Sequence, residues 1–235
     1  ETGGVNVRAG IVGAMALLMQ EIVGGLFDVT GDPFWNSLPF WALIFYVIFV
    51  GINIVGIEAT MRFTVTITVL SLAVLAFFIL AAIFSGELDF NLWTNIAKDG
   101  AEIPSGGGPM LPFGIEGIFK SLPFAIWFFL AIEEVPLAAE ESMDPRRDVP
   151  KGSVWGMHTL LIAAILVLVF NSALPGGAFL YGASGFPLLD GLYAIFGQNN
   201  ATELLGLLFM IGLVASFFTI IFAYGRNTYS LSRAG

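Results

Sequence analysis

Residues 121–139 read SLPFAIWFFLAIEEVPLAA, an apolar run that carries two adjacent acids and then a proline. The run has no polar face, as expected of a helix that lies in lipid or is deeply buried. Charge inside a membrane helix costs at least about 2.5–3.5 kcal/mol, so Glu133 and Glu134 are candidates for a functional role, with a structural role as the alternative for each. Pro136 removes a backbone donor and clashes with the preceding turn. The stretch therefore predicts a membrane helix that is broken near residues 131–136.

The composition of the whole chain agrees with a membrane protein. Its 235 residues are 57% hydrophobic and 11% charged, against about 45–50% and about 25% in ordinary soluble domains. The net charge of −9 disfavours nucleic acid as a partner. The chain has no cysteine and one histidine, so a disulfide, a Cys-ligated metal or a His-rich metal site is not expected. No cofactor is predicted.

Six stretches are long and apolar enough to span a bilayer, which takes about 20 residues. A membrane β-barrel would instead show alternating segments of about ten residues. We therefore expect an all-α integral membrane protein, with residues 1–235 forming one transmembrane domain. The expected spans cover about residues 9–27, 38–57, 63–84, 117–139, 153–174 and 204–224, with outer loops at 85–116 and 175–203. An amphipathic piece at 187–196 is expected to lie at the membrane interface.

The basic residues predict an orientation. Seven of the nine Lys and Arg residues lie in alternate connections, so six spans place them all on the cytoplasmic side together with both ends of the chain. These seven are Arg8, Arg62, Arg146, Arg147, Lys151, Arg226 and Arg233. The outward loops are acidic, with Asp190 and Glu203 among others, and would either attract small cations or simply be solvated. No signal peptide is visible at Glu1, and we expect an internal piece of a longer protein.

The predicted break is the main candidate site. Backbone groups freed at membrane depth are tolerated where they line a cavity or are covered by protein. Broken helices with an ion or substrate site at the break are typical of secondary transporters. Glu133 could bind a substrate or carry a coupling proton, or it could only hold the break together. Trp127 could stack on a substrate cation, or be an ordinary core or lipid-facing residue.

Three hydroxyl residues and one charged loop are further candidates. Ser71, Ser216 and Thr219 either bond back to the preceding turn of their own helix or supply oxygen ligands to Na⁺ or substrate. The loop candidates could pair across a turn as an inner gate, or could form an ordinary anchored loop; they are Glu140 and Glu141 with Arg146 and Arg147.

Several of these stretches also resemble a known family. FAIWFFLAIE at 124–133 and AAEESMDPRRDVPKG at 138–152 resemble the sixth helix and following loop of amino acid–polyamine–organocation (APC) permeases. Within that family they most resemble the ethanolamine permease group. GINIVGIEATMR at 51–62 and SFFTIIFAYGR at 216–226 agree. The resemblance covers about residues 36–235.

The resemblance implies a fold and a site. The six spans would be similar to helices three to eight of a twelve-helix carrier built on a five-plus-five inverted repeat, with the fourth span broken. Trp127 would then face the substrate, with Ala131, Ile132 and Glu133 at the unwound point. Ser216, Phe218 and Thr219 would face the same cavity. Some relatives have a lysine in place of a sodium ion near the position of Ser71, which leaves H⁺ and Na⁺ coupling both open.

The function expected on these grounds is secondary active import of a small amine or amino acid by alternating access, coupled to H⁺. Ethanolamine is the favoured substrate through the resemblance, and an amino acid antiporter is the alternative within the family. An intramembrane enzyme using Glu133 and Glu134 as acid and base would lack a nucleophile or metal partner. A channel would need a polar stripe along several helices. The expected location is the plasma membrane, as in a prokaryotic inner membrane.

The predicted orientation can be tested by cysteine scanning, because the chain contains no cysteine of its own. A membrane-impermeant thiol reagent should label a cysteine at position 98 or 190 from outside, and one at position 147 only after permeabilisation. The opposite pattern would invert the orientation.

Overall fold

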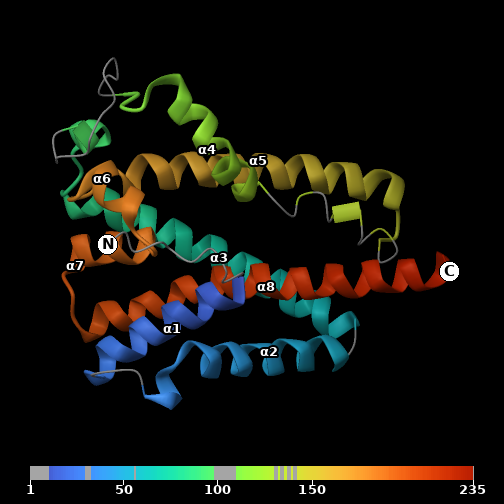
Figure 1. Ribbon diagram of the computed structural model, residues 1–235. Coiled ribbons are helices and arrows are strands. Elements are labelled where there is room, and N and C mark those ends of the chain that lie inside the picture. Colours follow the sequence, from blue (N-terminus) through green and yellow to red (C-terminus); the bar gives the residue numbers. More distant parts are fainter. Residues whose placement is uncertain are drawn as a thin grey trace. The chain divides into compact units, whose positions relative to one another are not determined.

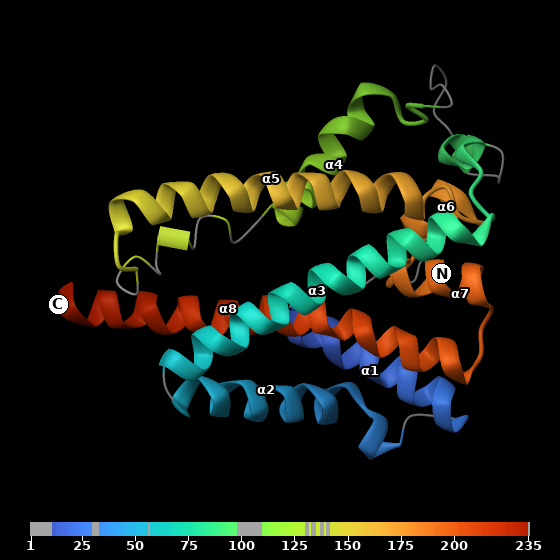
Figure 2. The same ribbon diagram turned by 180° about the vertical axis from the view of Figure 1, so that it is seen from behind.

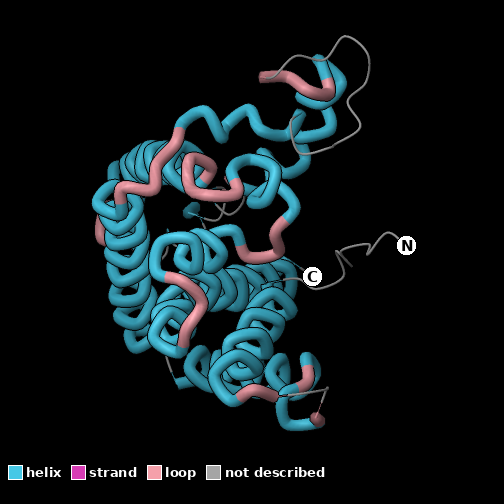
Figure 3. The backbone as a smooth tube through the Cα atoms, turned by 90° about the vertical axis from the view of Figure 1, so that its left-hand side faces the viewer, coloured by secondary structure: helices cyan, strands magenta, loops and turns pink. Residues whose placement is uncertain are grey.

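Helices make up the regular structure of the chain. The computed structural model describes residues 11–29, 33–55, 57–97, 110–129, 132, 135–136, 139 and 142–234. Throughout these residues the backbone forms helices joined by loops, without a β-strand (Figure 3). The all-helical prediction is therefore confirmed for the described part of the chain.

Within the part of the chain that the structure describes, three helices are long and apolar enough to cross a membrane. They lie at Arg62–Ser85, Pro145–Asn171 and Asn200–Arg233, and shorter apolar helices lie at Gly13–Phe27, Leu38–Ile52 and Pro187–Phe196. No residue in the apolar window of the Pro145–Asn171 helix is buried. Such an uncovered apolar surface suits contact with lipid tails. The six-span assignment itself stays a prediction.

The first of two compact units comprises residues 1–76 and 196–235. It contains α1 (Ile11–Phe27), η1 (Phe34–Asn36), α2 (Leu38–Val55), the first part of α3 (Ile57–Ser85) and α8 (Asn200–Ala234). Helix α1 packs against both α2 and α8, as views from opposite sides show (Figures 1 and 2). Its buried face includes Met15 and Ile22, each fully inaccessible to solvent.

A buried amide ties α1 to α2 within this unit. Asn36 is 3% exposed. Its Nδ2 donates to the carbonyl oxygen of Gln20 at 3.2 Å, and its Oδ1 accepts a hydrogen bond from Trp41 Nε1 at 2.9 Å. A buried amide that lacked these partners would destabilise the fold. Asn36 therefore stabilises the turn between the two helices.

The start of α8 packs closely against α1. Asn199 caps the helix, because its Oδ1 accepts hydrogen bonds from the backbone N–H groups of Ala201 and Thr202 at 3.0 and 3.1 Å. Glu203 in the first turn is buried against Gly25, where an added Cβ would lie 2.6 Å from Glu203 Oε1. Glu203 was expected in a solvated outer loop, and the structure instead places it in the α1–α8 contact.

The second unit comprises residues 77–195. After the end of α3 come the following helices: η2 (Phe90–Ala97), α4 (Gly114–Phe128), α5 (Pro145–Asn171), α6 (Gly177–Ala183) and α7 (Pro187–Phe196). The predicted amphipathic piece at 187–196 forms the helix α7, and its location at the membrane interface stays a prediction.

Helix η2 holds the end of α5 and the start of α6. Trp93 Nε1 donates to the carbonyl oxygen of Val169 at 3.1 Å. The N–H of Asp89 donates to the carbonyl oxygen of Ala173 at 2.8 Å. Buried Asn95 donates to the carbonyl oxygen of Gly176 and accepts from the N–H of Phe179, both at 2.9 Å. Carbonyl groups left over at a helix end need such partners. The loop predicted at 85–116 therefore contains a short helix, η2, that is hydrogen-bonded to α5 and to the start of α6.

Several predicted span boundaries differ from the helices, three of them by eight residues or more. Helix α5 begins at Pro145, so the residues predicted as a loop up to 152 form its first turns, with proline at the favoured N-terminal position. Helix α8 continues to Ala234, past the predicted end at 224. Helix α4 ends at Phe128, before the predicted break at 131–136.

The contact between α7 and α5 supplies a stability test. A Cβ on Gly191 would overlap Asn171 Oδ1 and lie 2.9 Å from Phe78 Cζ, whereas a Cβ on Gly182 in α6 would meet nothing within 4 Å. We expect Gly191→Ala to destabilise the protein by about 1–3 kcal/mol, as overpacked cores do. Gly182→Ala should leave the apparent Tm unchanged or raise it, because alanine favours helix.

The measurement is thermal unfolding of the purified full-length protein in detergent. An equal effect of the two substitutions would contradict the close α5–α7 packing.

Candidate functional site

The predicted site residues divide between the two units. Ser71, Ser216, Phe218 and Thr219 belong to the first unit, whereas those from Trp127 to Arg147 belong to the second. Trp127 lies at the end of α4. The side chain of Trp127 and the residues Ala131, Glu133, Glu134, Glu140 and Glu141 lie outside the described part of the structure.

The α-helical path of α4 stops at Phe128. The N–H of Phe129 donates to the carbonyl oxygen of Ile126 at 3.1 Å, which is a tighter turn than the α-helical one. Beyond it, the described residues Ile132, Val135, Pro136 and Ala139 have 3₁₀ geometry. These described residues, here called the 3₁₀ stretch, therefore do not continue the α-helix.

This 3₁₀ stretch packs on two glycines of α5. A Cβ on Gly156 would lie 3.2 Å from Ile132 Cδ1, and one on Gly152 would lie 3.8 Å from Val135 Cγ1. The glycines are four residues apart and therefore share one face of the helix. Small residues with this spacing allow close approach in membrane proteins. The spacing is visible in the sequence but was not among the predicted features.

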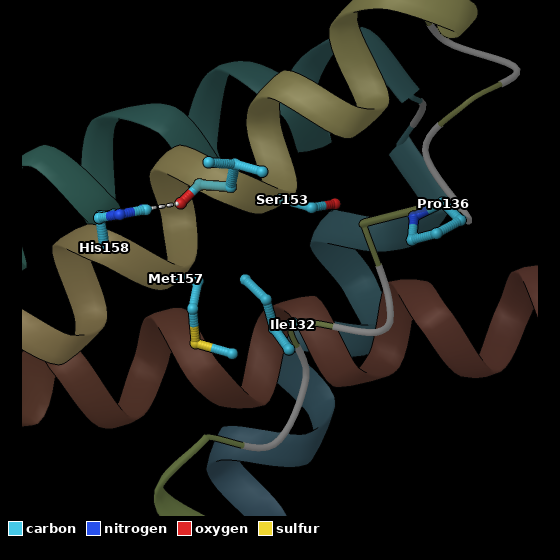
Figure 4. A pocket seen from close by; sticks show the side chains of 6 residues that line it. Ile132, Pro136, Ser153, Met157 and His158 are labelled. Carbon is cyan, nitrogen blue, oxygen red and sulfur yellow. Dashed lines mark hydrogen bonds between the residues drawn. The ribbon is translucent and has the colours of Figure 1, made fainter.

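A pocket of about 420 Å³ lies between the 3₁₀ stretch and α5. Figure 4 shows Ile132 and Met157 facing each other across it. Ser153 donates its hydroxyl hydrogen to the carbonyl oxygen of Val149 at 3.0 Å, so the lining is mainly apolar. The full lining is Ile132, Pro136, Ser153, Val154, Met157 and His158. Of these, sequence reasoning named only Ile132 as a site residue and missed His158.

Two of the three predicted hydroxyl ligands bond within their own helices. Thr219 Oγ1 lies 3.2 Å from the carbonyl oxygen of Ala215 and 2.9 Å from that of Ser216. Ser71 Oγ donates to the carbonyl oxygen of Ile67 at 2.8 Å. This is the bonding that hydroxyls usually adopt in membrane helices. Their roles toward Na⁺ or substrate stay predictions.

Phe218 is packed in an aromatic cluster of the first unit. It is fully inaccessible to solvent, and its ring centroid lies 4.7 Å from that of Phe63 and 6.3 Å from that of Phe49. Rings at these separations contribute about 0.5–1.5 kcal/mol per pair beyond the area that they bury. The structure therefore shows a packing role for Phe218, and its predicted contact with substrate remains untested.

The predicted inner gate is described only in part. Arg146 and Arg147 lie exposed in the first turn of α5, and the N–H of Arg147 donates to the carbonyl oxygen of Asp144 at 3.1 Å. The carboxylate of Asp148 accepts a hydrogen bond from Ser142 Oγ at 2.9 Å. These hydrogen bonds hold the backbone of the two arginines at the start of α5. The pairing of the arginines with Glu140 and Glu141 stays a prediction.

Two pKa shifts occur outside the predicted spans. The ammonium group of Lys120 donates to the exposed Glu116 carboxylate at 2.7 Å and lowers the pKa of that carboxyl group. Burial raises the pKa of Tyr181 to about 12, and the negative charge of Asp190 acts in the same direction. Asp190 in turn accepts a hydrogen bond from Ser184. Both shifts belong to local contacts away from the pocket.

No group of three or more His, Cys, Asp or Glu side chains that could hold a metal ion occurs among the residues that the structure describes. The described site consists of a helix end, an apolar pocket and one imidazole. This arrangement suits binding of a small molecule or a proton, because it offers few but well-defined polar atoms.

Comparisons with known proteins point to membrane transport. The sequence profile of the amino acid permease family matches residues 5–235. An uncharacterized transporter, R00093, of Rhizobium meliloti is 31% identical over 96% of this chain and 48% of its own length. The L-asparagine permease of Streptomyces coelicolor is 22% identical over 90% of this chain and 44% of its own length.

A third relative is named for another substrate. The branched-chain amino acid permease BcaP of Bacillus subtilis is 24% identical over 56% of this chain and 28% of its own length. The chain thus spans less than half the length of these three relatives. No solved structure matches the chain. The names of the family and of these relatives describe transporters and not enzymes.

The hydrogen bonds of Thr219 and the packing of Phe218 predict different effects of two substitutions on thermal stability. Thr219→Val removes a hydroxyl that bonds only to carbonyls of its own helix in the described structure, so the apparent Tm should change little. Phe218→Ala empties a fully buried site and should cost about 3–5 kcal/mol.

Thermal unfolding and substrate uptake are measured together for each full-length variant. A loss of uptake by Thr219→Val at unchanged Tm would reveal a substrate contact. A large fall in Tm for that variant would contradict the local bonding described for the hydroxyl.

Proposed function

The chain belongs to the amino acid permease family, and on that premise we propose that the full-length protein is a secondary active transporter that imports a small amine or amino acid by alternating access. The observation that carries the proposal is the match to this family over residues 5–235. The apolar helices support it, and so does the end of α4 at Phe128, before the predicted break, because carriers of this kind place their sites where a helix is interrupted.

The proposed substrate is a small cationic or zwitterionic amine, with ethanolamine favoured through the resemblance of residues 124–152 to the ethanolamine permease group. The relatives named for asparagine and for branched-chain amino acids support the wider amino acid class. In this proposal Trp127 faces the substrate cation and Glu133 supplies a carboxylate near it. An amino acid antiporter is the second candidate, and it is favoured by the same family match.

The proposed arrangement has six spans with both ends of this chain cytoplasmic, in the plasma membrane, and H⁺ as the coupling ion. The distribution of Lys and Arg residues supports the orientation. Na⁺ is the alternative coupling ion, for which Ser71, Ser216 and Thr219 would be oxygen ligands.

Uptake by vesicles that contain the full-length protein tests the function. We expect saturable uptake of radiolabelled ethanolamine or of an amino acid, and dissipation of the pH gradient should abolish accumulation but not exchange. Absence of saturable uptake for all amines and amino acids tried would exclude the carrier. Accumulation that follows a sodium gradient instead would replace H⁺ by Na⁺.

Glu133→Gln tests the proposed role of the acid at the interruption. The amide keeps the size of the side chain and removes its charge. If the carboxylate binds the substrate ammonium group, substrate binding should be lost. If it carries the coupling proton, accumulation and pH dependence should be lost while exchange persists. A variant with normal accumulation and pH response would leave Glu133 a structural residue.

A further inference from the structure

His158 is an ionisable residue in the interior of an apolar helix. It lies 13 residues after Pro145, which places it about 20 Å along α5 from the start of the helix. Helix α5 is one of the helices long and apolar enough to cross a membrane. An ionisable residue within such a helix is costly, so a function is the first hypothesis for it.

The hydrogen bonding of His158 assigns separate roles to its two ring nitrogens. Nδ1 lies 2.7 Å from the carbonyl oxygen of Val154 (dashed line in Figure 4). A carbonyl oxygen can only accept, so Nδ1 carries a hydrogen and donates it. In the neutral ring Nε2 is then the atom with a free lone pair. Nε2 is therefore the atom that gains or loses a proton.

His158 borders the pocket, and its ring centroid lies 6.3 Å from that of Trp155. His158 is exposed and lines the 420 Å³ pocket beside Ile132 and Pro136. Within the described part of the chain, no hydrogen bond joins another residue to Nε2. The hydroxyl group of Ser153, the other polar side chain of the lining, is already bonded to Val149. A water molecule that entered the pocket could thus exchange a proton with Nε2.

Among the residues that the structure describes, few charged groups lie near this pocket. On α5 the nearest is Lys151, seven residues earlier and about 10 Å along the helix. On the facing 3₁₀ stretch, no described lining residue is ionisable. Glu133 and Glu134 follow Ile132 directly in sequence and lie outside the described residues. Imidazole is the ordinary side chain that changes charge between pH 5 and 8, which suits a proton carrier at neutral pH.

We propose that His158 Nε2 is the binding site of the coupling proton. The inference rests on the proposed transport function. In the outward-open state a proton from outer water binds Nε2 and the ring becomes an imidazolium; in the inward-open state Nε2 returns the proton to inner water. The Nδ1–Val154 hydrogen bond persists in both forms, because it needs no change at Nδ1. Glu133 is then left to bind the substrate ammonium group.

Accumulation driven by a pH gradient tests the proposal. Full-length protein is placed in vesicles as wild type, His158→Gln and Thr159→Val. The Thr159→Val variant is a matched control, because Thr159 is adjacent and exposed. Among the described residues its hydroxyl bonds only to the carbonyl oxygen of Trp155, at 2.9 Å. One proton per substrate across one pH unit supports up to about tenfold accumulation.

We expect wild type and Thr159→Val to approach this limit with labelled ethanolamine, or with the amino acid that wild type takes up. The accumulation ratio of His158→Gln, inside over outside, should be about onefold. Its uptake should lose pH dependence between pH 5.5 and 8. Wild-type accumulation and pH dependence in His158→Gln would overturn the proposal and leave the carrier function standing. A wild type that takes up no amine or amino acid contradicts the carrier function itself.

Nitrogen NMR of wild-type protein labelled at its single histidine reports the protonation of both ring nitrogens. This measurement does not depend on the folding of a variant. Nδ1 should stay protonated at every pH, and Nε2 should titrate. Since proton and substrate binding are linked, saturating substrate should move the titration midpoint of Nε2. A midpoint that does not respond to substrate, or a neutral ring protonated at Nε2 and not at Nδ1, would overturn the assignment.

Discussion

Pairing of backbone polar groups within the chain is the constraint on which this structure depends. In a chain with 57% hydrophobic residues, the backbone groups that lie in lipid have little water to bond to. An unpaired N–H or C=O group there costs several kcal/mol. Helices satisfy this constraint except at their ends. Several polar side chains bond to groups at these ends: Asn199 caps α8, and Trp93 and Asn95 bond to carbonyl groups at and after the end of α5.

The same constraint explains why so few polar atoms remain for chemistry. The hydroxyls of Ser71, Ser153 and Thr219 bond to carbonyls of their own helices. Against that background, Nε2 of His158 is an exception, because no described residue bonds to it and His158 lines an apolar pocket beside Ile132 and Pro136. Because a polar atom without a protein partner is expensive in lipid, such exceptions mark the places where a substrate or a proton can bind.

Glycines determine how closely the elements of each unit approach. Gly25 receives the carboxylate of Glu203, Gly156 receives the side chain of Ile132, and Gly191 receives the amide of Asn171. Between apolar helices in lipid, van der Waals contact and hydrogen bonds replace the hydrophobic drive of soluble cores, so small residues at the contact carry much of the packing. The wall of the pocket formed by Ile132 depends on one of these glycines.

Hydropathy and periodicity alone were enough to predict the all-helical class, the apolar helices and the bounds of α7, because burial in lipid imposes one simple pattern. Only the tertiary structure showed that α5 starts at Pro145, that α8 continues to Ala234, and that Phe218 packs between Phe49 and Phe63. Hydropathy reports which residues prefer lipid, whereas a helix ends where its hydrogen bonds end. Partners such as Gly25 for Glu203, or Gly176 for Asn95, come from distant parts of the chain, and no local pattern contains them.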